Sequence, residues 1–202
     1  GVNCGIYQGF DEERFRAFRK GMVTLRERVA EQGGEVLHLT PWPYDHSRGT
    51  IEAGDYNQAV LGRYAQWLLA RRADGWKVID LHGPMTAEMK SRRAEDPQFT
   101  FQGDGVHPNR EGHWFGARVM IRALGGDQSA QAGDAGEMMK RFTGGAEALP
   151  LVEQRMQLLR DAWLSHTGHL RPGIRAGLPL AEAGRKAAEI AARIEAARLE
   201  TK

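Results

Sequence analysis

The stretch Val36–Pro43, VLHLTPWP, contains the first clear strand of the sequence. A short apolar run that ends in Pro41-Trp42-Pro43 is typical of a buried strand with a rigid exit, because proline holds the residue before it in an extended conformation. A second run of this kind, Trp76–Leu81, follows the turn at Asp74-Gly75. We therefore predict two buried strands.

Helical periodicity surrounds both predicted strands, since apolar residues recur every three or four positions. The first helix follows a capping Asp11 and ends at Gly33-Gly34. The inward-facing residues of the two main helices are Phe15, Phe18, Met22, Leu25 and Val29, then Val60, Leu61, Tyr64, Trp67 and Leu68. Further helices are predicted over 85–94 and after Pro108. Helices that alternate with buried strands predict an α/β fold with a parallel sheet covered on both faces.

Two clear strands are few for such a sheet. We expect the first few residues to supply a third strand. An exposed edge of apolar strands promotes association, so we also expect a homodimer in which a second copy of the chain covers that edge.

Composition changes along the chain predict three regions. Residues 1–125 hold the α/β pattern. Residues 126–148 are dominated by glycine, alanine and small polar residues, which predicts a flexible linker or loop. Residues 149–202 form a helical extension, with one helical pattern over Leu151–Trp163 and another that starts at Pro179.

Charge and cysteine content exclude several classes of protein. The 202 residues carry 28 lysines and arginines against 26 acids, and these charges alternate instead of forming a basic block, so we expect no nucleic-acid partner. The sequence has no sustained apolar run, so we expect no membrane span. A single cysteine, Cys4, excludes an intrachain disulfide and leaves the compartment open. No signal peptide is visible, which predicts a cytoplasmic protein if Gly1 is the genuine start.

The stretch Gly103–Asn109, GDGVHPN, places an acid and a histidine three residues apart. A carboxylate that accepts the proton on one ring nitrogen of histidine fixes its tautomer and leaves the other nitrogen basic. Asp104 and His107 could therefore act as an orienting acid and a general base. Local chemistry alone also allows a second interpretation, an aspartate that caps a turn beside a histidine at a helix entry.

Other polar residues follow the predicted strands. In a parallel α/β sheet, functional sites gather at the carboxyl ends of the strands. This rule would bring together Asn3-Cys4-Gly5, the loop 41–48 and the loop 82–84, with the Asp104–His107 loop beside them.

The GDGVHPN stretch, followed by EGHWFGA at 111–117, resembles the last signature block of the SGNH, or GDSL-type, hydrolases. GVNCG at 1–5 resembles their third block, G-x-N-D. LTPWPYD at 39–45 and VIDLHGPM at 78–85 are similar to strand and loop segments of the family in the same order, and the tail WLSHTGHLRPGIRAGLPLAEA resembles an extension of some bacterial members. The resemblance implies a truncated flavodoxin-like, three-layer parallel sheet and hydrolysis of a small ester.

Residue by residue, the resemblance implies that His107 is the general base, Asp104 its partner and Asn3 an oxyanion donor. The family's first block, with its G-D-S serine, and its second block, with a glycine donor, precede the third block. The chain begins at the third block, so we expect an SGNH-like domain that lacks the nucleophile block. Cys4 also replaces the aspartate of G-x-N-D.

Four hypotheses deal with the nucleophile. Cys4 could attack as a thiolate. Alternatively, Asp45, His46, Asp104 and His107, with His38 or His82 as further candidates, could hold zinc or another divalent metal that activates water, which would suit phosphoesters as well as carboxylesters. A serine of a partner chain could stand in, whereas Ser47 is interpreted as ordinary loop polarity. Finally, the chain could be an inactive, dimerising remnant. The family mechanism itself requires no cofactor.

Overall fold

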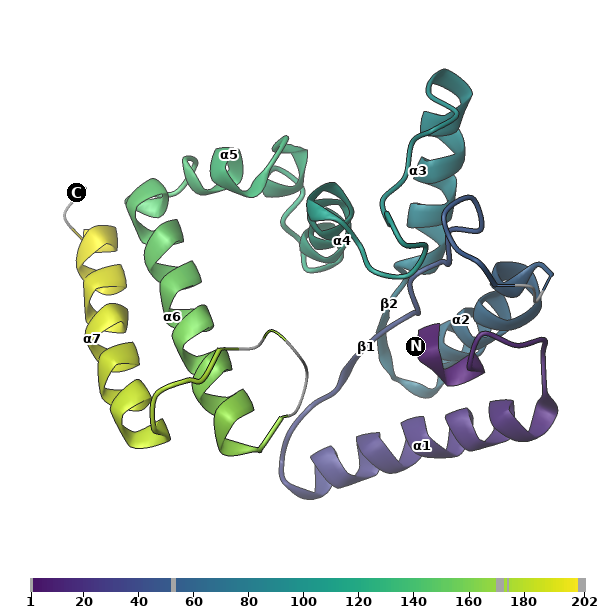
Figure 1. Cartoon of the computed structure of the whole chain (residues 1–202), viewed down its shortest axis with the longest axis horizontal. Coiled ribbons are helices and arrows are strands. Elements are labelled where there is room, and N and C mark those ends of the chain that lie inside the picture. The colour runs from purple at the N-terminus through teal and green to yellow at the C-terminus, as the bar shows by residue number, and fades with distance from the viewer. Residues whose placement is uncertain (1, 52–53, 170–172, 174, 200–202) are drawn as a thin grey trace. The chain divides into compact units, whose positions relative to one another are not determined.

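A computed structural model describes residues 2–51, 54–169, 173 and 175–199 (Figure 1). The chain divides into two compact units, Gly1–Ala130 and Gln131–Lys202. Among the described residues, no helix is both long enough and apolar enough to cross a membrane.

The sheet of the first unit consists of β1 (Leu37–Leu39) and β2 (Lys77–Ile79), which are parallel and pair His38 with Val78. Both predicted strands are therefore present, although each is shorter than its apolar run. The chain enters β2 from Gly75, whose φ of +77° is in the left-handed region that glycine tolerates. Just past β1, the Thr40 amide donates to the Ile79 carbonyl over 3.0 Å, which extends the pairing toward the loops.

The predicted third strand is wrong for the described residues, because Val2–Gly5 form a short 3-10 helix, η1. Its backbone bonds locally: the Ile6 amide donates to Asn3 and the Gln8 amide to Gly5. The Tyr56 hydroxyl holds the Val2 carbonyl at 2.8 Å. The described residues form a mixed α/β fold that is mostly helical, with a two-stranded sheet instead of the predicted three-layer one.

Helices connect the strands as the sequence predicts. The first helix, α1 (Glu12–Glu31), begins where the Arg14 amide donates to the Asp11 side chain over 2.7 Å. Between the strands, a π-helical turn η2 (Asn57–Leu61) continues into α2 (Gly62–Ala70) and η3 (Arg71–Asp74). These elements share one core, whose buried members are Phe18, Tyr44, Tyr56, Val60, Leu61, Tyr64, Leu68 and Val78.

The second half of α1 departs from its predicted inward face. Leu25 is 50% exposed, and Leu37 and Leu39 of β1 are 42% and 39% exposed. An amphipathic helix buries its stripe only where a sheet or another helix lies beneath it. Because the sheet of the described residues has two strands, part of the predicted apolar face remains at the surface.

A second core supports the end of the first unit, where α3 (His82–Glu95) and α4 (Arg110–Ala123) pack. Its buried members are Met85, Met89, Phe99 and Phe101. Asn109 caps α4 by accepting the Gly112 amide at 2.9 Å. A Cβ at Gly112 would lie 2.8 Å from the Phe101 carbonyl, so this close approach of helix to loop requires glycine. The loop between α3 and α4 is thereby fixed at both ends.

A short 3-10 helix, η4 (Ser129–Gln131), spans the boundary between the units. The second unit contains α5 (Ala135–Met139), α6 (Gly145–His166) and α7 (Leu180–Leu199). Figure 1 shows α6 and α7 side by side and antiparallel. The residues buried on these helices are mostly small: Ala148, Ala162, Ala183, Ala187 and Ile190. The predicted linker region 126–148 contains η4, α5 and the first turn of α6.

Candidate functional site

The loop between α3 and α4 brings Asp104 and His107 into contact. Asp104 Oδ2 lies 2.7 Å from His107 Nδ1. Asp104 Oδ1 accepts the backbone amides of Val106 and His107 at 2.9 and 2.8 Å. An ionised carboxylate only accepts hydrogen bonds, so Nδ1 carries the proton and Nε2 is the basic nitrogen. One oxygen therefore caps the turn while the other orients the ring, and the two interpretations of this aspartate coexist.

The Asp104–His107 pair is open to solvent. The side chains are 59% and 73% exposed, respectively. The His107 backbone amide, followed by its ring and the Val106 amide, holds the pKa of Asp104 far below its usual value. The carboxylate therefore stays ionised throughout the range in which a histidine accepts or releases a proton. Such an arrangement can support proton transfer by His107.

The turn that carries the pair is bound to the segment after β1. Gly105 has a φ of +83°, and its carbonyl accepts the Asp45 amide at 2.9 Å. The wholly buried Gln102 donates from Nε2 to the Pro43 carbonyl at 2.8 Å and to the Val106 carbonyl at 3.0 Å. Two segments far apart in the sequence are thus joined directly beneath the pair.

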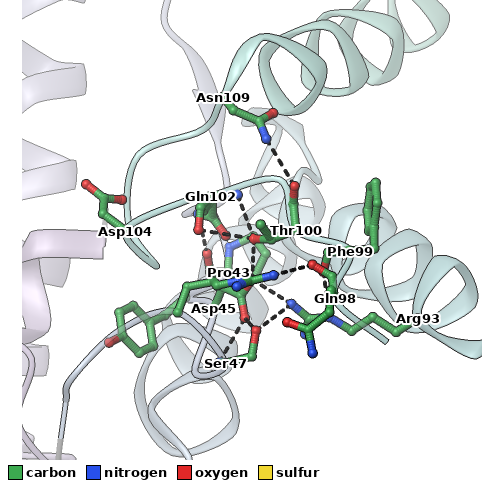
Figure 2. Close-up of polar contacts among 12 residues, drawn as sticks. Pro43, Asp45, Ser47, Arg93, Gln98, Phe99, Thr100, Gln102, Asp104 and Asn109 are labelled. Carbon is green, nitrogen blue, oxygen red and sulfur yellow. Dashed lines mark hydrogen bonds and ion pairs between the residues drawn. The ribbon is translucent and has the colours of Figure 1, made fainter. Parts of the chain in front are cut away.

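A buried aspartate lies at the centre of this junction (Figure 2). The Asp45 side chain is 0% exposed, and its Oδ2 is 2.6 Å from Arg93 Nη2. The Thr100 hydroxyl also donates to Oδ2, and the Ser47 amide and hydroxyl donate to Oδ1 at 3.0 and 2.7 Å. Burial raises the pKa of Asp45, but the hydrogen bonds from Thr100, Ser47 and Arg93 outweigh it and leave the pKa below its usual value.

The partners of Asp45 extend the network into the loop. Arg93 Nε donates to the Phe99 carbonyl at 2.8 Å. The backbone amide of Gln102 donates to the Thr100 hydroxyl at 2.9 Å. Sequence analysis did not single out Arg93, Thr100 or Gln102. The alternation in Phe99-Thr100-Phe101-Gln102 was a usable signal, because it puts the two apolar and the two polar side chains on opposite sides of an extended segment.

The other predicted site residues, Asn3 and Cys4, lie on η1. The Asn3 amide oxygen accepts the Tyr7 hydroxyl, a contact that does not use the NH2 group an oxyanion donor needs. Cys4 is partly buried against the core that contains Tyr56. Val106, next to His107, packs against the same core. Both the η1 segment and the Asp104–His107 turn therefore border one group of buried side chains.

Several of the candidate metal ligands have other partners in the structure. Asp45 is engaged by Arg93, Thr100 and Ser47. Across the part of the chain that the structure describes, no three histidine, cysteine, aspartate or glutamate side chains lie close enough to hold a metal ion. Asp45 faces the partly exposed Arg93, and Asp104 faces His107 within its own turn. Metal binding by Asp45, His46, Asp104 and His107 stays a prediction.

The two further histidines proposed as ligands have other surroundings. His38 stacks on Trp76 with ring centroids 4.6 Å apart, and burial lowers its pKa. His82 Nδ1 lies 3.2 Å from the Pro41 carbonyl, and burial lowers its pKa as well. Both are interpreted as neutral, packed histidines. Ser47, interpreted from sequence as ordinary loop polarity, instead donates to the buried Asp45.

An open pocket of about 480 Å³ lies next to this network. Its wall includes Asp45, His46, Lys90 and Arg93. The pocket therefore adjoins the segment that supports the Asp104–His107 turn, and its lining combines these polar groups with Tyr44, Met89 and Ala94.

Comparison with known proteins identifies no family for this chain and one distant structural likeness. No family model matches the sequence, and no curated protein matches it. Among solved structures, the chain is similar to BT4096, a gut microbial diltiazem-metabolizing enzyme, at 22% sequence identity and a TM-score of 0.48. The likeness covers 56% of this chain and 27% of that one, so the chain spans about a quarter of that enzyme's length. A likeness of this degree assigns neither a fold nor an activity.

Proposed function

We propose that the chain contributes the acid and histidine of an SGNH-type ester hydrolase. His107 is the general base, Asp104 orients it, and Asn3 donates to the oxyanion. The observation that carries this proposal is the 2.7 Å contact between Asp104 Oδ2 and His107 Nδ1, within a turn whose amides keep the carboxylate ionised. The motif resemblance of Gly103–Asn109 supports the same assignment.

In the proposed reaction, His107 Nε2 takes the proton of a hydroxyl or thiol as that group attacks the ester carbonyl carbon. The carbonyl oxygen becomes an oxyanion, to which the Asn3 NH2 group donates. The C–O bond to the alcohol then breaks, and His107 returns its proton to the leaving alcohol. Water, deprotonated by His107 in turn, hydrolyses the acyl group from the nucleophile.

The nucleophile has two possible sources. Residues 1–202 contain no G-D-S triplet, so a family-type serine would have to come from outside these residues. Within them, the proposed nucleophile is Cys4, which lies on η1 next to Asn3. A thiol reagent would inactivate a Cys4 enzyme, whereas a serine-directed phosphonate would inactivate a serine enzyme.

The proposal is tested by esterase assays on p-nitrophenyl esters of short acids. We expect His107→Ala to lower kcat/KM by at least about a hundredfold, the usual contribution of a general base. His113→Ala is the matched control, because this exposed histidine lies on α4 six residues further along and outside the pair. Equal activity of His107→Ala and wild type would overturn the base assignment. A wild-type protein with no turnover would favour the remnant hypothesis instead.

A further inference from the structure

Helix α6 has a face that α7 does not cover. Toward α7 it presents buried Ala148 and Ala162, and its Arg155 Nε donates to the Ala187 carbonyl at 3.3 Å. A second apolar stripe repeats at alternating steps of three and four residues, the spacing of a helix-pairing seam. Its members are Leu149, Val152, Met156, Leu159 and Trp163.

This stripe is substantially exposed. Met156 is 65% and Trp163 is 55% exposed, while Leu149, Val152 and Leu159 are half-buried. From Leu149 to Trp163 the stripe extends over fourteen residue steps, or about 21 Å of helix. A continuous apolar surface of this kind marks an interaction site more often than scattered exposed residues do.

We infer that a second copy of the chain covers this stripe, with the two α6 helices antiparallel. A two-fold axis between Met156 and Leu159 places each of these residues opposite the other on the partner, and Val152 opposite the partner's Trp163. The bulky Trp163 then faces the smaller Val152 at both ends of the seam. Such a contact uses the same patch on both copies and closes at two chains.

Charge decides between the antiparallel and parallel arrangements. In the antiparallel register, Glu153 lies opposite the partner's Arg160, and symmetry repeats this attractive pair on the other side of the axis. A parallel register would instead bring Arg160 next to the partner's Arg155, which is turned toward its own α7 and offers no acid, so this attractive pair would be missing. Glu153 is exposed, and Arg160, 59% exposed, contacts Asp161 of its own helix at 2.7 Å. Arg160 is thus at the surface and within reach of a second acid.

This association is distinct from the dimer predicted through the sheet edge, because it uses the second unit alone. It also does not rest on the proposed hydrolase activity. Trp163 and Met156 can therefore be changed without touching Asp104 or His107.

The test is the molar mass of the full chain in solution, by light scattering and sedimentation velocity across the micromolar range. We expect twice the chain mass of 22.5 kDa for wild type. Trp163→Glu should give a monomer with unchanged helical circular dichroism. Leu124→Glu, at a 70% exposed leucine outside the stripe, is the matched control and should remain dimeric.

Charge exchange tests the register. Glu153→Arg and Arg160→Glu should each raise the dimer dissociation constant by about tenfold or more, because each places like charges across the seam twice. The double variant should restore the wild-type constant. A monomeric wild type, or a dimer that persists in Trp163→Glu, would overturn the inference. Failure of the double variant to restore dimerisation would overturn the antiparallel register.

Discussion

Asp45 and Asp104 are aspartates in neighbouring, hydrogen-bonded loops, and their surroundings are opposite. Asp45 is 0% exposed and is held by Arg93, whereas Asp104 is 59% exposed and faces His107. The pKa of each is lowered, but at Asp45 hydrogen bonds must first overcome burial, while at Asp104 the backbone amide and ring of His107 act almost unopposed. The comparison separates a carboxylate that holds the structure from one that is available for chemistry.

The physical basis of this difference is solvation. A buried charge is tolerated only when it is paired and hydrogen-bonded, so removing one partner strands the others away from water. An exposed pair regains water when it is broken and contributes little to stability. Stability should therefore depend on Asp45, and the reactivity of His107 on Asp104.

Asp45→Ala should have the largest effect on folding. It removes the acceptor of Arg93, Thr100 and Ser47, and we expect the free energy of unfolding to fall by about 3 kcal/mol, the lower end for a broken buried pair because Arg93 is partly exposed. Urea unfolding followed by circular dichroism measures this. Asp104→Asn, in the adjoining loop, keeps the acceptor of the Val106 and His107 amides and should leave the unfolding curve in place. Equal curves for wild type and Asp45→Ala would remove the distinction between the two aspartates.

Thr100→Val should have a smaller effect of the same kind. The substitution keeps the shape of the side chain but leaves the buried Asp45 carboxylate with one donor fewer, which costs about 1.5 kcal/mol. The same unfolding experiment applies. Thr86→Val is the control, since the exposed Thr86 hydroxyl donates to the His82 carbonyl within α3. A larger loss for Thr86→Val than for Thr100→Val would contradict the proposed role of the network.

How far the sequence could predict these regions depends on the separation of the partners. The contact of Asp104 with His107 spans three residues, so the motif alone suggested it. Asp45 meets Arg93 and Thr100 across 48 and 55 residues, and no local pattern indicates which buried donor an acid will face. The same limit applies to the metal hypothesis, because it named suitable residue types without knowledge of their mutual distances.

The fold shows the same limit. The Asp11 cap and the apolar spacing of α1 act within a few residues, and α1 starts where those signals predict. A strand, by contrast, needs a neighbouring strand to satisfy its backbone. Val2–Gly5 satisfy theirs through a local helical turn and Tyr56, a contact 54 residues distant that the sequence pattern does not reveal.

Acid titration sharpens the comparison of the two carboxylates. The pKa of Asp45 is lowered in the folded protein, so its contribution to stability is fully present above the unfolded value, about 3.9, and is lost as the pH falls through the folded pKa. The midpoint temperature of thermal unfolding of wild type should therefore fall steeply below about pH 4. Asp45→Asn should show a shallower dependence in this range. An unchanged acid slope in that variant would mean that Asp45 does not remain ionised when buried.

Asp104→Asn should have the smallest effect on stability and the most specific effect on chemistry. The asparagine oxygen can still accept the Val106 and His107 amides, so the turn should persist and the unfolding curve should not move. Its NH2 group, however, would then face His107 Nδ1, which must accept rather than donate. The proton would move to Nε2, the nitrogen that the proposed reaction requires to be basic. Nitrogen-15 spectra of the imidazole should show this change of tautomer, with esterase activity reduced by about a hundredfold or more. Retention of the Nδ1-protonated form would show that the exposed loop, and not the carboxylate, sets the tautomer of His107.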